Sequence, residues 1–178
     1  IIPGSVLERA DKDLEDAFGY NAEIGMNCSI NDFLKFDLSF FRMRYDHRMG
    51  NIVLQDSTGN YTYKTNIGNS VTNGLELYAE INIIDKSKWR INLFTSTSLM
   101  KAVYEDAIIA AGSINVDVSG NEVESVPRWI SRSGLNVAYK TLNSNLQYSY
   151  VSDSYSDPLN TVQPTANGSK GIVPAYGI

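Results

Sequence analysis

Apolar and polar residues alternate one by one through long stretches of this chain. In residues 20–30 the even positions are apolar, and the odd positions are polar or glycine. Residues 34–40 repeat the pattern, and Asn31 and Asp32 stand between the two segments. A period of two residues places successive side chains on opposite faces of a β-strand, so we expect a hairpin that turns at Asn31 and Asp32.

The same alternation recurs further along the chain. It is clear in residues 71–83 and 89–100, weaker in residues 128–139, and clear again in residues 146–150. A last strand is expected to begin near Ile172. The sequence therefore predicts an all-β protein of about seven strands, most of them close to the roughly ten residues that a tilted membrane-spanning strand needs.

The connections between these strands fall into two length classes that alternate along the chain. This order puts every short turn at one end of an antiparallel sheet and every long loop at the other. Bacterial outer-membrane barrels are built in this way, with short periplasmic turns and long extracellular loops. The first long loop also holds a hairpin of its own around residues 56–59. The short turns are predicted at residues 31–32, 85–87 and 141–145, and the long loops at residues 46–68, 102–126 and 153–171.

The two faces of the predicted sheet differ in chemistry. A soluble sandwich also alternates, so the composition of the second face has to distinguish the two architectures. One face is charged, with Phe94 and Met100 as apolar exceptions, and the other carries aromatic rings toward the strand ends. We expect Ile24, Phe36, Leu77, Ile81 and Leu93 to face lipid, Glu23, Asp37, Glu80 and Asn92 to face a polar interior, and Tyr20, Trp89, Trp129, Tyr139 and Tyr150 to form aromatic girdles.

Composition and charge exclude several functions. A formal net charge of -5 without a basic cluster argues against a nucleic-acid partner. One Cys and one His leave no disulfide framework and almost nothing for a His-based metal or catalytic site, so we expect neither enzyme activity nor a cofactor. No apolar run approaches the roughly 18 residues of a membrane helix. Because open edges in lipid are costly, we expect residues 1–178 to be part of a single barrel domain that is incomplete at both ends.

Several segments resemble TonB-dependent receptors, particularly those of the ferric-citrate and siderophore type. An acidic residue and an aromatic precede a Glu-x-Gly in residues 14–25, and residues 69–77 contain a Gly-hydrophobic-Glu strand opening. The C-terminal third is the best match, with Val126-Pro127-Arg128, residues 148–157 leading to Asn160, and residues 171–176. No plug domain, energy-coupling box or terminal aromatic is found in these residues.

The resemblance implies more than the strand pattern does. It implies a barrel of about 22 strands in the bacterial outer membrane, with a plugged lumen, of which this chain would be about a third. It also implies four partners: the remainder of the barrel and its plug, an inner-membrane energy-coupling protein, outer-membrane lipid, and a ferric chelate as ligand. Transport by this piece alone is not expected.

Four basic residues are candidate ligand contacts. Arg128 and Arg132 share the polar face of one predicted strand just after a long loop, where an opening lumen could hold an anionic ferric chelate. A structural ion pair with Glu76, Glu80 or a plug residue is the favoured alternative, because paired lumen charges need no ligand to explain them. His47 and Arg48 lie in a long loop and could touch a ligand, lipopolysaccharide or only solvent. The candidate set is Arg128, Arg132, His47 and Arg48.

A partial calcium-binding motif is weaker evidence for a site than these basic residues. Residues 115–120 match the first half of an EF-hand loop, with oxygen donors at alternate positions and Gly120 at the sixth. Position twelve is Val126, where a bidentate Glu is needed. We therefore expect a loop tip with a glycine turn and no metal.

Two other functions remain open at this point. A soluble β-sandwich that binds carbohydrate or acts as an adhesin would account for loops rich in Tyr and Asn, but not for the regular exchange of short and long connections. A passive porin would share the barrel wall and need no plug. The leading hypothesis is the barrel-wall portion of an active-transport receptor.

Overall fold

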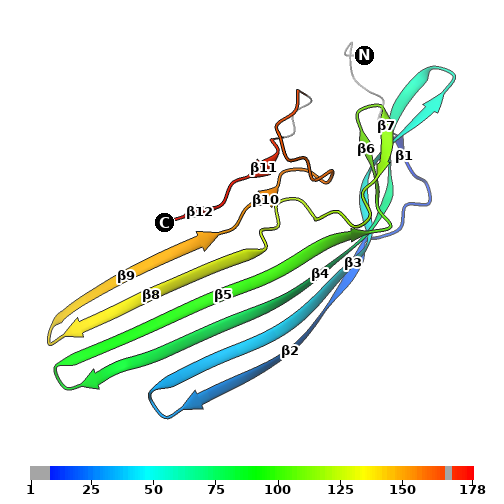
Figure 1. Cartoon of the computed structure of the whole chain (residues 1–178). Helices are drawn as coiled ribbons and strands as arrows, with labels where there is room; N and C mark the ends of the chain where they lie inside the picture. The colour runs from blue at the N-terminus through cyan, green and yellow to red at the C-terminus, as the bar shows by residue number, and fades with distance from the viewer. Residues whose placement is uncertain (1–8, 167–169) are drawn as a thin grey trace.

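The computed structural model describes residues 9–166 and 170–178 as strands joined by turns and loops. The main sheet has the order β12-β9-β8-β5-β4-β3-β2, and β1 pairs with β4 (Figure 1). The seven strands on this path agree with the predicted number. No described segment forms a helix that could span a membrane. The strands are β1 Arg9–Ala10, β2 Phe18–Ile30, β3 Leu34–Asp56, β4 Gly59–Lys86, β5 Trp89–Glu105, β6 Ile108–Ala111, β7 Ile114–Asp117, β8 Trp129–Tyr139, β9 Leu142–Val151, β10 Ser154–Tyr155, β11 Ile172–Val173 and β12 Tyr176–Gly177.

The strand register assigns each residue to one of two faces, because residues directly opposite each other lie on the same face. We call them the polar face and the apolar face. A row on the polar face runs through Asn27, Asp37, Tyr78, Ser96, Arg132 and Ser149. A row on the apolar face runs through Ile30, Leu34, Ile81, Leu93, Leu135 and Leu146. The register confirms that the two sets of residues predicted to face lipid and interior lie on opposite faces.

Many side chains of the apolar face are exposed and have no second layer packed on them. Ile24, Leu142 and Leu146 are 75%, 71% and 71% exposed. Two packed sheets would bury such side chains in a core about 10 Å thick. The buried hydrophobic residues of the described chain instead lie near the end of β5, in the segment after it, and midway along β4 opposite the end of β5. They are Val71, Ala102, Tyr104, Ala107 and Val118. The soluble β-sandwich alternative is therefore wrong.

Two aromatic residues interrupt the polar face because each covers a glycine on the next strand. Phe94 on β5 lies opposite Gly134 on β8, and Phe41 on β3 lies opposite Gly74 on β4. A Cβ atom at either glycine would overlap the phenylalanine ring. A ring packed across a bare glycine fills the space that a side chain would otherwise occupy. The exception that the sequence shows at Phe94 is thus a cross-strand packing contact.

Two aromatic pairs mark the ends of the apolar band. The rings of Trp89 and Tyr139 lie 4.4 Å apart beside the short turns, and those of Trp129 and Tyr150 lie 4.8 Å apart toward the long loops. Trp129 is opposite Leu99, which is ten residues from Trp89 on β5. Ten residues span about 33 Å of strand, or about 25 Å of membrane at a tilt of about 40°. This agrees with the height of the apolar band on outer-membrane barrels.

The first long connection differs from the prediction. Residues 46–68 do not form a loop, because β3 and β4 continue through them as one hairpin that rises beyond the other strands (Figure 1). A register shift next to His47, whose φ is 54°, separates the lower and upper parts of the hairpin. The inner hairpin predicted around residues 56–59 is confirmed as its tip. An isolated two-stranded ribbon is marginal in water, and here β1 and β6–β7 pack against it.

Two predictions at the C-terminal side are also wrong in detail. The turn predicted at residues 141–145 occupies only Lys140 and Thr141, because a positive φ of 51° at Lys140 permits a tight two-residue hairpin. Ile172 does not begin a strand of the main sheet. It pairs with Tyr155 in the small β10–β11 sheet, and the strand beside β9 is β12.

Candidate functional site on the polar face

Open hollows lie along the polar face of the described residues. One of about 790 Å³ lies near the short turns over β4, β5, β8 and β9. One of about 480 Å³ lies over β2 to β5, and one of about 690 Å³ lies over β5, β8, β9 and β12. Hydroxyl, amide and charged side chains line much of each hollow. Such a surface suits a water-filled lumen and cannot face hydrocarbon.

A ladder of four asparagines crosses the polar face beside the short turns. Asn82, Asn92, Asn136 and Asn145 stand opposite one another on β4, β5, β8 and β9. Asn92 Nδ2 donates to Asn82 Oδ1 at 3.0 Å, Asn136 Nδ2 donates to Asn92 Oδ1 at 3.0 Å, and Asn145 Nδ2 donates to Asn136. Cross-strand side-chain hydrogen bonds of this kind stabilise a sheet. The ladder therefore gives the hollow of about 790 Å³ a hydrogen-bonded amide lining.

Arg132 is the cation of the hollow over β8, β9 and β12. Its side chain is exposed, and no ion pair of the described chain involves it. Ser96 and Ser149 flank it in the same row, and Gln147 also lines the hollow. Ser98 in the same hollow has a buried hydroxyl oxygen without a hydrogen-bond partner in the described chain. A guanidinium among hydroxyl and amide donors can hold a carboxylate or another oxyanion.

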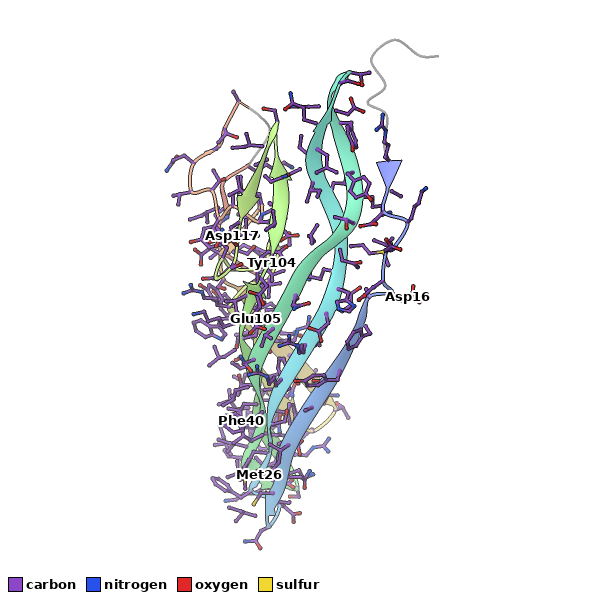
Figure 2. All side chains as sticks on the ribbon, turned by 90° about the vertical axis from the view of Figure 1, so that its right-hand side faces the viewer. Asp16, Met26, Phe40, Tyr104, Glu105 and Asp117 are labelled. Carbon is purple, nitrogen blue, oxygen red and sulfur yellow. The ribbon has the colours of Figure 1, made fainter. Side chains whose placement is uncertain are left out.

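The loop after β5 folds over the polar face at the long-loop end. Tyr104 lies opposite Ser70, in the polar-face register, yet it is only 2% exposed. Ala107 and Val118 cover its ring and are themselves buried. Figure 2 shows Tyr104 and Asp117 close together, beyond the lower part of the sheet. The β6–β7 segment therefore covers the polar face around Tyr104. We call this covered region, at the long-loop end of the polar face, the mouth.

Arg48 is held in this mouth by aromatic and hydroxyl contacts. Its guanidinium lies 5.2 Å from the ring centre of Tyr104 and donates to Ser70 Oγ at 3.1 Å. The Tyr104 hydroxyl donates to Glu124 Oε2 at 2.6 Å. Burial, together with the Glu124 carboxylate, raises the pKa of Tyr104 far above its ordinary value. Tyr104 therefore remains a protonated donor at neutral pH.

His47 has different partners from its neighbour Arg48. Its Nδ1 atom lies 2.8 Å from Glu15 Oε2, and its ring meets the Phe18 ring edge-on at 5.2 Å. Its backbone N–H is bonded to Asn69 Oδ1. The structure thus ties His47 to the N-terminal segment, whereas Arg48 lies in the mouth. The two residues do not form one site.

Arg128 is engaged by a loop carboxylate. It forms an ion pair with Glu122, and its Nε atom donates to Glu122 Oε2 at 2.9 Å. The hydrogen bond from Arg128, reinforced by its charge, lowers the pKa of Glu122. The alternative that paired Arg128 with Glu76 or Glu80 is wrong, because Glu122 reaches β5 through a bridge to Val103 and stands beside Arg128. Arg128 and Arg132 consequently do not act as a pair.

Three asparagines, none of them among the candidate ligand contacts, clamp the long-loop end. Asn115 bonds both backbone groups of Val53, at 2.7 and 2.8 Å. Asn160 does the same to Glu122, at 2.7 and 2.8 Å, and Asn66 bonds both backbone groups of Glu15 at 2.9 Å. A side-chain amide offers one acceptor and a donor, as a neighbouring strand would. Asn115, the first residue of the partial calcium motif, is occupied in this way.

A bare apolar face, a hollowed polar face and aromatic rows about 25 Å apart describe the wall of a membrane barrel. The family model of the TonB-dependent receptor-like β-barrel matches residues 3–178. The chain belongs to the TonB-dependent receptor β-barrel family. No curated protein matches this sequence. The resemblance to TonB-dependent receptors is therefore confirmed, and so is the outer-membrane location of this barrel segment in Gram-negative bacteria.

Solved structures of transporters share the fold. The unliganded ferric citrate transporter FecA matches with a TM-score of 0.65 and 20% identity, over 90% of this chain and 22% of that one. The FrpB iron transporter from Neisseria meningitidis matches with a TM-score of 0.62 and 16% identity, over 97% and 25%. The copper transporter OprC matches with a TM-score of 0.59 and 11% identity, over 96% and 24%. This TonB-dependent receptor segment spans about a quarter of the length of each.

Family membership assigns the two faces of the receptor segment. Its polar face lines the lumen and its apolar face contacts lipid, with the short turns on the periplasmic side and the long loops outside the cell. Members of this family are receptors and transporters, not enzymes. The hollows described above and the region around Tyr104 therefore lie on the lumen side of the receptor segment.

Proposed function

We propose that this chain is part of the wall of an active-transport receptor that imports a ferric chelate, such as citrate or a siderophore, across the outer membrane. In this proposal a plug fills the lumen, and an inner-membrane energy-coupling protein drives transport. The transporters that share this fold carry different metals, namely iron and copper. The choice of ligand therefore has to rest on residues of this chain.

The observation that carries the proposal is the environment of Arg132. It is an exposed lumen-facing cation without an ion-pair partner in the described chain, and it lies in a hollow of about 690 Å³. Ser149 and Gln147 supply neutral donors beside it. A guanidinium fork binds carboxylate or another oxyanion in a bidentate fashion. Ferric citrate and many siderophores present such groups.

The distribution of charge on the lumen face supports contact at this side of the segment. The acidic residues Glu23, Asp37, Glu76 and Glu80 lie on β2, β3 and β4. Arg132 lies on β8, two strands from β4 and therefore about 10 Å away from that strand. An anionic chelate would be repelled by the first group and attracted by the second. We assign ligand contact to the β8–β9 side, while Arg128 serves its ion pair with Glu122.

The test uses the full-length receptor in cells that lack other ferric citrate uptake. Arg132→Ala should weaken binding of ferric citrate by about 30-fold, because a hydrogen-bonded charge contributes about 2 kcal/mol. Arg132→Lys should recover only part of the loss, since a point charge lacks the fork. Arg90→Ala is the matched control, because Arg90 also lies on the lumen face but near the periplasmic turns.

Two results would contradict the proposal. Unchanged binding in the Arg132→Ala receptor would remove ligand contact from this hollow, and an equal loss in Arg90→Ala would indicate general charge attraction. Uptake should also stop in de-energised cells. Uptake that continues without energy would favour the passive porin.

A further inference from the structure

A row of cationic and amide side chains lies on the lipid face just outside the aromatic girdle. Arg42, Asn73 and Lys101 stand opposite one another on β3, β4 and β5. They follow the row of Phe40, Leu75, Leu99 and Trp129 by two residues, on the same face. Two residues are about 7 Å of strand, so the row lies about 5 Å beyond the girdle in a tilted barrel. That is the depth of the lipid headgroups in the outer leaflet.

The cations of this row form no salt bridge within the described chain. Arg44, one row further out, is neutralised by Asp46 and Glu105 at 2.7 and 2.9 Å. No salt bridge of the described chain involves Arg42 or Lys101, and both side chains are exposed. Lys101 is near enough to Glu122 for its charge to help lower the pKa of that carboxyl, but Glu122 forms its salt bridge with Arg128. Two unpaired positive charges at headgroup depth attract anionic lipid.

The row is also shaped to receive a headgroup. Arg42 and Asn73 line a hollow of about 410 Å³, together with Ala22, Ile24 and Phe40 of the same face. Glu23, Phe41 and Gly74, which belong to the polar face, also border it. Arg42 Nη1 donates to Asn73 Oδ1 at 3.2 Å, which orients the amide so that its Nδ2 group can donate outward. The apolar side chains of the hollow lie on the membrane side of these polar groups. A site with donors above and apolar surface below fits a phosphate attached to acyl chains.

We propose that the Arg42–Asn73–Lys101 row binds the phosphate of an outer-leaflet lipid headgroup. The guanidinium fork contacts the phosphate oxygens, Lys101 supplies a second charge, and Asn73 donates between them. Ile24 and Phe40 pack against the start of the acyl chains. This site is on the lipid side of the wall and is independent of the proposed chelate transport.

The test measures binding of bisphosphorylated lipid A to the full-length receptor in detergent by native mass spectrometry. Each Lys or Arg at an anionic lipid surface strengthens binding about fivefold, so Arg42→Gln combined with Lys101→Gln should weaken it about 30-fold. The control receptor carries Lys86→Gln and Lys88→Gln, the same loss of charge at the periplasmic turns. It should bind within about twofold of the wild type.

Two further measurements identify the recognised group. Dephosphorylated lipid A should bind wild type and the double variant equally, and inorganic phosphate should not displace lipid A, because it lacks the acyl chains. Arg42→Lys should keep the contribution of the charge but lose that of the fork, so its affinity should lie between wild type and Arg42→Gln. Heat-modifiable gel migration reports that each variant is folded. Wild-type affinity in the folded double variant would overturn the proposal. So would an equal loss in the control receptor, or tight binding of dephosphorylated lipid A that depends on Arg42.

Discussion

Replacement of Tyr104 should release the extracellular loop that covers the mouth. Tyr104→Phe keeps the ring under Ala107 and Val118 but removes the 2.6 Å hydrogen bond to Glu124. A hydrogen bond to a charged group contributes about 2 kcal/mol, so opening of the loop should become about 30-fold more frequent. Tyr104→Ala also removes a buried aromatic ring, a change that costs about 3–5 kcal/mol in protein cores.

Limited proteolysis of intact cells expressing the full-length receptor measures this opening. Proteinase K is needed, because no Lys or Arg lies between Lys101 and Arg128 for trypsin to cleave. When reclosing is faster than cleavage, the cleavage rate follows the population of the open loop. We expect about a 30-fold faster cut within residues 106–126 for Tyr104→Phe and at least about 100-fold for Tyr104→Ala.

The matched control for this experiment is Tyr45→Phe. Tyr45 belongs to the same row as Tyr104 but is 42% exposed, and its hydroxyl has no hydrogen bond within the described chain. The loop of the Tyr45→Phe receptor should therefore be cut at the wild-type rate. If Tyr104→Ala leaves the cleavage rate unchanged, the cluster around Tyr104 does not hold the loop, and the argument for a covered mouth fails.

Three other perturbations test the fold and its loops. Gly74→Val should destabilise the barrel by about 1–3 kcal/mol in urea, because its side chain overlaps the Phe41 ring, and a Phe41→Leu second substitution should recover part of the loss. Arg128 lowers the pKa of Glu122, so their ion pair stabilises the loop at pH values above the ordinary carboxyl pKa of 4.5. This stabilisation is lost as the pH falls below that value. Protease cleavage of the loop should therefore rise in acid in the wild type but not in Glu122→Gln. Proteases added to sealed cells should not cut at residues 85–87, and a cut there would contradict the orientation of the barrel.

Several site features could be predicted from sequence only in part. The lumen position of Arg132 follows from the alternation of the sequence, because successive side chains of a strand point to opposite faces. The partner of Arg128 did not, since Glu122 lies in a loop whose path has no periodicity. For Arg48, the sequence predicts a position in a long loop and leaves ligand, lipopolysaccharide and solvent open as its contacts, whereas the β3–β4 hairpin carries it back over Tyr104. Its position depends on pairing across a hairpin, which local sequence does not encode.

The sequence by itself determined the elements that rest on local periodicity. Strand positions, the two faces, the aromatic girdles and the alternation of short and long connections all follow from a period of two residues and from turn chemistry. The tertiary structure decided what depends on register. The asparagine ladder, the rings over Gly74 and Gly134, and the Arg42–Asn73–Lys101 row each join residues about ten to more than forty positions apart. Only backbone pairing between strands brings such residues together, and a shift of one residue would turn each set to the opposite face.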